Sequence, residues 1–249
     1  MSRFPILLTN DDGINSPGLL HLASSLHSLG HPIAILAPLT EQSAVGMKLT
    51  LRDDMAFEEH TDIAEKIRTD ESVPLRAFSL AGSPCDCVIV AIDGGLRSWA
   101  PEIRPWLCIS GINRGPNLSV DVLHSGTVSA AREASLYGLP SLSVSLATYS
   151  HQDYSQSIEA TLALVERLSE LVTVEPSNIL RPEGSRTRPI EGTGPNSLRS
   201  WFMQGNMFLN LNIPEDWNGT FQTVPLGARW YHNATDMIDQ KSMGVAFEV

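Results

Sequence analysis

Two adjacent aspartates follow a short hydrophobic run near the start of the chain. Residues 6–9 (Ile-Leu-Leu-Thr) lead directly into Asn10, Asp11, Asp12 and Gly13. Neighbouring carboxylates repel each other unless a proton or a cation lies between them, and hard divalent cations prefer oxygen ligands. The pair therefore suggests a metal site. The same residue types are also common in turns, and the residues alone leave both interpretations open.

Three further polar groups could take part in the same chemistry. Ser43 lies in a loop after the second apolar run, and its hydroxyl could bind a metal or a phosphate. The segment 110–117 contains Asn113 and Asn117, whose amides offer an oxygen to a metal and a donor to an oxyanion. Residues 125–127 (Ser-Gly-Thr) begin an expected helix, where backbone N–H groups suit an anion. A solvated serine, a tight turn and a helix cap are the ordinary alternatives.

Hydrophobic periodicity predicts the elements that must position these groups. The expected strands cover residues 6–9, 33–37, 75–80, 106–110, 141–146 and 208–213. The expected helices begin at Pro17, at Pro84 and near Gly126, and one more is marked by the apolar residues at 158–168. The first strand, helix and second strand form a βαβ unit, which implies parallel strands. The carboxyl ends of such strands share the sheet edge at which α/β proteins bind ligands.

The remaining segments give weaker patterns. Residues 39–74 are polar and acidic without a clear period, and residues 176–200 are rich in Pro, Gly, Ser and Arg, which predicts a long loop. Periodicity is also weak after Pro214. We therefore expect a single domain over 1–249, with a core of about 1–175 and a divergent C-terminal extension of about 176–249.

Composition restricts the partners that the chain is expected to bind. Its 249 residues include 17 basic and 28 acidic side chains, and the net charge of −11 argues against a nucleic-acid polymer or an anionic membrane as main partner. The three cysteines lack a disulfide or metal spacing, and no apolar run approaches the roughly 20 residues of a membrane span. A cytoplasmic protein is expected.

Read in order, the motifs resemble those of the SurE (survival protein E) phosphatase family. The resemblance extends over roughly residues 5–150 and is weaker beyond them. It rests on seven segments, which are 7–13 (Leu-Leu-Thr-Asn-Asp-Asp-Gly), 16–18 (Ser-Pro-Gly), 37–43, 81–88 (Ala-Gly-Ser-Pro-Cys-Asp-Cys-Val), 110–117 (Ser-Gly-Ile-Asn-Arg-Gly-Pro-Asn), 125–146 and 210–214 (Asn-Leu-Asn-Ile-Pro).

The resemblance implies a fold, a reaction and an assembly. The fold would be a three-layer, Rossmann-like α/β fold with a mostly parallel sheet and a small C-terminal extension. The reaction would be divalent-metal-dependent hydrolysis of nucleoside 5′- or 3′-monophosphates, with one Mg²⁺ or Mn²⁺ per subunit. The assembly would be a homodimer or homotetramer built through exchange of C-terminal elements.

The resemblance also implies roles for individual residues. The metal would be held by Asp11, Asp12, Ser43 and Asn113. The phosphate would be bound by Asn117, Ser125, Gly126 and Thr127. Asp11 would act as both metal ligand and base, and Asn10 would lie beside the metal and help to stabilise charge on the phosphate.

Departures from the family pattern keep other functions in view. The loop after Pro38 reads Leu-Thr-Glu-Gln instead of a more basic run, and Ala44 replaces a usual glycine. These departures favour, as an alternative, a nucleotide-binding regulatory protein with weak or no catalytic activity. A phosphoaspartyl transferase with Asp11 as nucleophile lacks its usual Asp-x-Asp spacing. A dehydrogenase lacks a Gly-x-Gly-x-x-Gly after the first strand.

Overall fold

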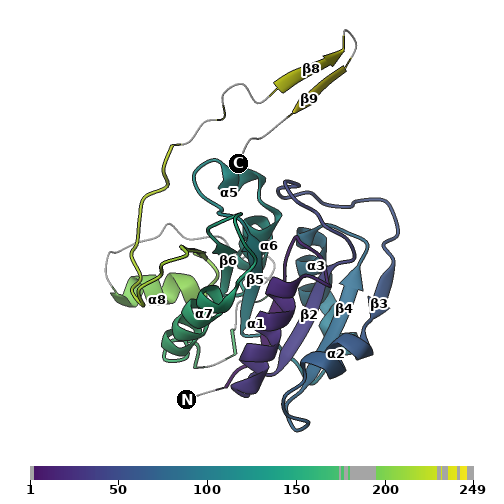
Figure 1. The fold of residues 1–249 in the computed structure, drawn as a ribbon. Helices are drawn as coiled ribbons and strands as arrows, with labels where there is room; N and C mark the ends of the chain where they lie inside the picture. The colour runs from purple at the N-terminus through teal and green to yellow at the C-terminus, as the bar shows by residue number, and fades with distance from the viewer. Residues whose placement is uncertain are drawn as a thin grey trace.

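A sheet of seven strands runs through the centre of the described part of the chain (Figure 1). This computed structural model describes residues 3–173, 175–176, 179, 195–228, 231, 235–239 and 242–245. The strand order is β3-β4-β2-β1-β5-β6-β7, and every neighbouring pair is parallel except β3 and β4. The strands are β1 (Ile6–Thr9), β2 (Ile33–Pro38), β3 (Phe57–Glu59), β4 (Leu75–Leu80), β5 (Leu107–Arg114), β6 (Ser141–Leu146) and β7 (Leu209–Ile213).

Helices cover both faces of this sheet. One hydrophobic cluster joins Ile6 and Leu8 of β1 to α1, α2, α7 and α8, and the other joins Leu7 of β1 to α3, α4 and α6. The side chains of β1 thus alternate between the two faces, as expected for a strand buried on both sides. The helices are α1 (Pro17–Ser28), α2 (Thr61–Ile67), α3 (Pro84–Val90), α4 (Leu96–Trp99), α5 (Asp121–His124), α6 (Gly126–Leu136), α7 (Ser155–Leu168) and α8 (Pro195–Met203). The predicted three-layer α/β fold is confirmed.

The order of the strands reverses at β1. The chain passes from β1 to β2 on one side, and β5 later occupies the other side. The connections that leave β1 and β5 therefore diverge, and a crevice opens at their carboxyl ends. Such switch points are where open α/β sheets bind ligands.

Strand β5 and the region 39–74 differ from the expected elements. Strand β5 continues through Arg114 instead of ending at Ser110, because Gly111 adopts φ +135° and pairing with β6 resumes after a register shift. The poorly patterned region 39–74 contains β3, whose three residues are all exposed at the sheet edge, and the seven-residue α2. Neither is long enough to show a period.

The C-terminal part also holds more structure than its composition indicates. Residues 195–200, expected as loop, belong to α8, because Phe202 on that helix is buried against the core. The rest of the predicted loop lies outside the described residues, apart from Pro176 and Ile179. After β7 an extended segment leads to a hairpin of β8 (Thr235–Asp239) and β9 (Ser242–Val245), which lies apart from the sheet (Figure 1). None of the described helices combines the length and apolar character that crossing a bilayer requires.

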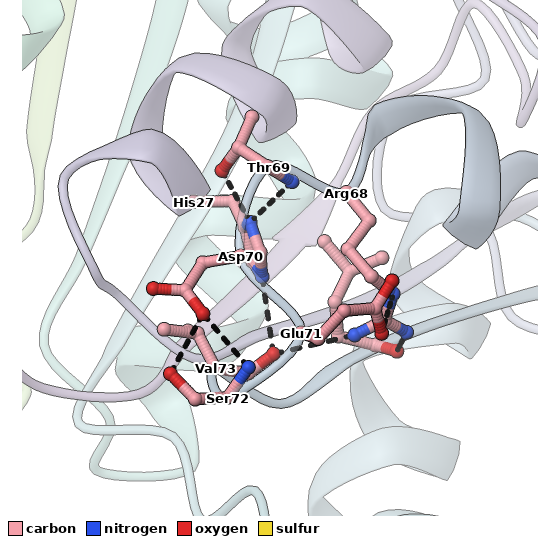
Figure 2. Close-up of polar contacts among 8 residues, drawn as sticks. His27, Arg68, Thr69, Asp70, Glu71, Ser72 and Val73 are labelled. Atoms are coloured by element: carbon pink, nitrogen blue, oxygen red, sulfur yellow. Dashed lines mark hydrogen bonds and ion pairs between the residues drawn. The ribbon is translucent and has the colours of Figure 1, made fainter.

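A buried histidine anchors the connection between α2 and β4, at the amino ends of the strands (Figure 2). His27, in the last turn of α1, is fully buried. The backbone N–H of Thr69 donates to His27 Nδ1 (3.1 Å), so Nε2 carries the proton and donates to the carbonyl of Val73 (3.1 Å). The Asp70 carboxylate accepts hydrogen bonds from Ser72 in the same connection. The neutral imidazole thus joins a helix to a loop 42–46 residues away.

We expect His27→Ala to lower the free energy of unfolding by about 2–3 kcal/mol, because it removes buried packing and leaves backbone groups without partners. His21→Ala on the same helix is the matched control, since His21 is exposed and its change should cost less than about 0.5 kcal/mol. Urea unfolding of both variants measures the difference. Equal stability of the two variants would contradict the anchoring role of His27.

Candidate functional site

The residues singled out from the sequence gather around the crevice between β1 and β5. Asp11 and Asp12 lie in the turn after β1, one residue beyond its end, and Asn113 and Arg114 end β5. The loop after β2 returns to the same place, because Gln42 N–H donates to the Asp11 carbonyl (2.7 Å). The fold therefore brings the segments after β1, after β2 and at the end of β5 to one edge of the sheet. The last two of these are more than 60 residues apart in the chain.

Asn10 builds the turn that presents the two aspartates. Its amide nitrogen donates to the carbonyl of Gly13 (2.9 Å) and to Oγ of Ser16 (2.7 Å), and its amide oxygen accepts from Gly13 N–H (3.2 Å). Gly13 has φ +94°, a conformation that favours glycine. Both donors of the Asn10 amide are thus engaged within the turn, and Ser16 in addition caps α1.

Asp11 points toward the start of α6. Thr127 donates its backbone N–H to Asp11 Oδ2 (2.9 Å) and its hydroxyl to Oδ1. The carboxylate is only 3% exposed. Burial raises the pKa of Asp11, and the hydrogen bonds from Thr127 oppose this shift without cancelling it. Asp11 is therefore a desolvated carboxylate held from one side by a helix N-terminus.

The start of α6 is shaped around Asp11. Ser125 caps the helix by accepting a hydrogen bond from Val128 N–H (3.0 Å). A Cβ atom on Gly126 would lie 2.7 Å from Cβ and 2.9 Å from Oδ2 of Asp11, closer than real contacts allow. The sequence predicts an anion site over residues 125–127. In this structure the anion that Thr127 binds is the protein's own Asp11 carboxylate.

Asp12 is partly exposed, unlike the buried Asp11. Its Oδ2 atom is buried and has no hydrogen-bond partner among the described residues. Burial first, and then the charge of Asp11, raise the pKa of Asp12 to about 7. Asp11 thus meets Thr127 and Asp12 meets the pocket described next, and the two carboxylates still interact electrostatically.

A pocket of about 700 Å³ opens beside Asp12. Of the predicted site residues its lining includes Asp12 and Ser43, and the other six predicted residues with assigned metal or phosphate roles do not line it. Ser43 is exposed and donates to Oε1 of Glu41 (2.8 Å). The lining consists of Asp12, Gly13, Asn15, Ser16, Pro17, Leu39, Thr40, Glu41, Ser43, Arg114, Tyr149, Gln152 and Tyr154.

The two asparagines of the 110–117 segment hold different positions. Asn113 is half-buried and its amide nitrogen donates to the carbonyl of Gly115 (2.8 Å). Asn117 is buried and its amide nitrogen donates to Ser145 Oγ (2.8 Å). Its backbone groups pair with the side chains of Asn210 and Asn212. Asn117 is thus tied to β6 and β7.

Several of these residues were not identified as functional from the sequence. The pairing of Asn210 and Asn212 with Asn117 could have been suspected, because residues two apart on a strand share a face. Arg114 lies inside the 110–117 motif, at the end of β5, but was not assigned a role. Tyr149, Gln152 and Tyr154 line the pocket without carrying a motif, and their one available signal is that they follow the carboxyl end of β6.

The donor set restricts the metals that the site could bind. Within the part of the chain that the structure describes, no three His, Cys, Asp or Glu side chains gather as a metal-binding group. A metal at this edge would therefore need neutral oxygen atoms in addition to two carboxylates. Such an all-oxygen set is typical of Mg²⁺, Ca²⁺ or Mn²⁺ sites.

Comparisons with known proteins agree with the fold. The family model described as "Survival protein SurE" matches residues 6–235. The 5′-nucleotidase SurE of Synechococcus sp. (strain JA-3-3Ab) is 42% identical over 165 residues, and that of Syntrophotalea carbinolica is 42% identical over 167 residues. Each alignment covers 66% of this chain and 59% of the relative. The matched part thus spans less than two thirds of these relatives.

A solved structure extends the comparison to most of the described fold. The crystal structure of the SurE protein from Aquifex aeolicus superposes with a TM-score of 0.63 and 26% sequence identity. The superposition covers 97% of this chain and 82% of that protein.

Proposed function

The chain belongs to the SurE family, and from this membership we propose that it hydrolyses nucleoside 5′-monophosphates, releasing a nucleoside and phosphate, with the help of a bound Mg²⁺ or Mn²⁺. The relatives that support the proposal are named 5′-nucleotidase SurE. Because the matched part covers only 59% of the first two of them, the activity, the substrate and the metal are proposed for this chain.

The observation that carries the proposal is the carboxylate pair at the switch point. Asp11 is held by the start of α6, and Asp12 presents a buried oxygen without a partner beside a 700 Å³ pocket. A buried carboxylate oxygen normally has a hydrogen-bond donor. A cation at this oxygen would satisfy it and would also offset the repulsion between the two carboxylates.

The described residues fit a hard divalent cation. Burial raises the pKa values of Asp11 and Asp12, and for Asp12 the nearby charge of Arg114 only partly offsets the shift. Asp11, Asp12, Ser43 and Asn113 would hold the ion, and all four offer oxygen. When bound, such an ion polarises a phosphoryl oxygen and lowers the pKa of water.

The other residues of the site would orient the two aspartates, bind the phosphate or offset its charge. Thr127 fixes the Asp11 carboxylate, and Asn10 fixes the turn that carries both aspartates. Among the described lining residues of the pocket Arg114 carries the one cationic side chain, and it would offset the charge of an entering phosphate. We keep Asp11 as the base and Asn117, Ser125, Gly126 and Thr127 as phosphate-binding candidates. The backbone N–H and the hydroxyl of Thr127 both donate to Asp11, so Thr127 would bind phosphate only in addition to these bonds.

A panel of phosphomonoesters tests the proposal. Adenosine 5′- and 3′-monophosphate, ribose 5-phosphate and p-nitrophenyl phosphate are each incubated with the protein and Mg²⁺, Mn²⁺ or EDTA, and released phosphate is measured. We expect release from the 5′-nucleotide with either metal, its loss in EDTA and its return when metal is added back. Thermal unfolding with and without Mn²⁺ gives a second readout, and we expect Mn²⁺ to raise the midpoint.

Two outcomes would count against the proposal. Undiminished phosphate release in EDTA would show that the hydrolysis does not depend on a metal. Binding of nucleotide without turnover at any metal would favour the alternative, a regulatory nucleotide-binding protein. A cytoplasmic location and assembly into a homodimer or homotetramer stay predictions.

A further inference from the structure

The connection between β6 and α7, residues 147–154, forms a wall of the pocket beside Asp12. Tyr149, Gln152 and Tyr154 from this connection line the pocket. Two contacts hold the wall in place, because Arg114 donates to the carbonyl of Tyr149 (2.9 Å) and Ser150 Oγ donates to Glu215 Oε1 (2.6 Å). The wall is therefore fixed to the end of β5 and to the segment that follows β7.

The three side chains lie at different depths. Tyr154 is only 4% exposed, whereas Tyr149 is 44% exposed and Gln152 is also exposed. Tyr154 thus belongs to the floor of the pocket, and Tyr149 and Gln152 belong to its rim. The Tyr154 ring is packed against α1, where a Cβ on Gly18 would lie 3.1 Å from its Cε1 atom.

The polar atoms of two of these side chains are unused. Within the described residues, neither the Tyr154 hydroxyl nor the Gln152 amide makes a hydrogen bond. The Tyr154 hydroxyl is not among the fully buried polar atoms that lack a partner, so it is open to the pocket that the side chain lines. The hydroxyl of a tyrosine whose ring is buried normally bonds to protein, ligand or ordered water. The Tyr154 ring packs against α1, and its hydroxyl is left available to a ligand in the pocket.

The pocket offers more room than a phosphate requires. Its volume of about 700 Å³ lies within the range of sites that enclose whole small molecules, about 300–1,000 Å³. Asp12 and Ser43 account for the phosphate and metal end. The remaining wall combines aromatic rings with an amide, which is the chemistry that stacks on a nucleobase and bonds to its edge.

We propose that Tyr149, Gln152 and Tyr154 bind the nucleoside half of the substrate. The Tyr154 hydroxyl bonds to the ribose, which is next to the phosphate, and the Tyr149 ring stacks on the base at the rim, where the Gln152 amide bonds to the base edge. This wall selects nucleotides over simpler phosphomonoesters. The inference rests on the proposed function, since it places the phosphate at Asp12.

Three substrates that contain a whole nucleoside, only its ribose or neither test this assignment. Adenosine 5′-monophosphate, ribose 5-phosphate and p-nitrophenyl phosphate share the ester, and kcat and KM are measured for each with Tyr154→Phe and Tyr149→Leu. For Tyr154→Phe we expect a loss of kcat/KM, mainly through KM, that is about fivefold larger on the two ribose substrates than on p-nitrophenyl phosphate. For Tyr149→Leu we expect a loss about tenfold larger on adenosine 5′-monophosphate than on the other two.

Tyr137→Phe is the matched control, because Tyr137 caps the far end of α6 and does not line the pocket. Unchanged ratios between the three substrates in both test variants would overturn the inference and leave the proposed function standing. A lower thermal midpoint for Tyr154→Phe with unchanged ratios would also overturn it, since the hydroxyl would then bond to a structural water.

If the wild-type protein hydrolyses none of the three esters, the proposed function fails and the wall is tested by itself. Calorimetric titration with adenosine then decides. Binding that is about tenfold weaker in Tyr149→Leu supports the wall, and absence of binding to the wild-type protein overturns it.

Discussion

Asp12→Asn is expected to lower kcat/KM on adenosine 5′-monophosphate by at least about 100-fold while raising the thermal midpoint of the protein in EDTA at pH 8. The substitution keeps the shape of the side chain and removes its charge. Without a cation, the charge of Asp12 is unfavourable, because it is desolvated and lies near Asp11. The same change is thus expected to weaken metal binding at the proposed site and to stabilise the fold in the absence of metal.

The sign of the pH dependence follows from the direction of the shift. The pKa of Asp12 rises from 3.8 to about 7 in the folded protein, so the folded state holds the proton more tightly than the unfolded state. In EDTA its contribution to stability is intact below pH 3.8 and is lost as the pH rises toward 7. We expect Asp12→Asn to recover about 2 kcal/mol at pH 8 and nothing at pH 3.5.

Thermal unfolding in EDTA between pH 3.5 and 8 measures this difference, and adding Mn²⁺ at pH 8 should stabilise the wild-type protein more than the variant. Asp53→Asn is the matched control, because Asp53 is exposed and no hydrogen bond or ion pair is found for its side chain among the described residues. A variant that loses activity but shows the wild-type pH profile of stability would contradict the electrostatic account.

Gly126→Ala is expected to reduce kcat on the same substrate by about 100-fold, because positioning errors near 1 Å can cost this much. The added methyl would lie 2.7 Å from Asp11 Cβ and 3.1 Å from Pro84 Cγ, so either the carboxylate or α6 must move. Overpacking of this kind also costs about 1–3 kcal/mol of stability. Both effects arise from a single carbon atom that touches Asp11.

Ser129→Ala on the same helix provides the comparison. The Ser129 hydroxyl is buried without a hydrogen-bond partner among the described residues, so its removal should leave stability and activity within error of wild type. Steady-state kinetics and urea unfolding of both variants separate loss of position from loss of fold. Wild-type activity in Gly126→Ala would show that Asp11 tolerates displacement and would weaken its proposed role.

Much of the fold could be predicted from the sequence because its signals are local. Strands β1 and β2 are mostly apolar and buried on both faces, β6 alternates serine with leucine or valine, and α1 begins with the Ser16 cap and Pro17 that the sequence indicates. The elements that escaped prediction lack such signals. The edge strand β3 has three exposed residues, and the extension of β5 beyond Ser110 depends on renewed pairing with β6.

The candidate site was predictable as a set of residues and not as an arrangement. The Asn-Asp-Asp-Gly run is visible in the sequence because its residues are adjacent. What each carboxylate meets is decided by contacts between distant segments. Asp11 meets Thr127, which is 116 residues away, and Asp12 meets a pocket whose wall follows β6.

The sequence by itself therefore determined the layers, the central strands and the acidic turn, since each depends on side chains within a few residues of one another. Only the tertiary structure decided that the start of α6 holds Asp11 and that Tyr154 lies on the floor of the Asp12 pocket. These contacts arise when parallel strands far apart in the chain bring their carboxyl ends to one edge of the sheet. The order of strands in a sheet, unlike hydrophobic periodicity, cannot be recognised in a local stretch of residues.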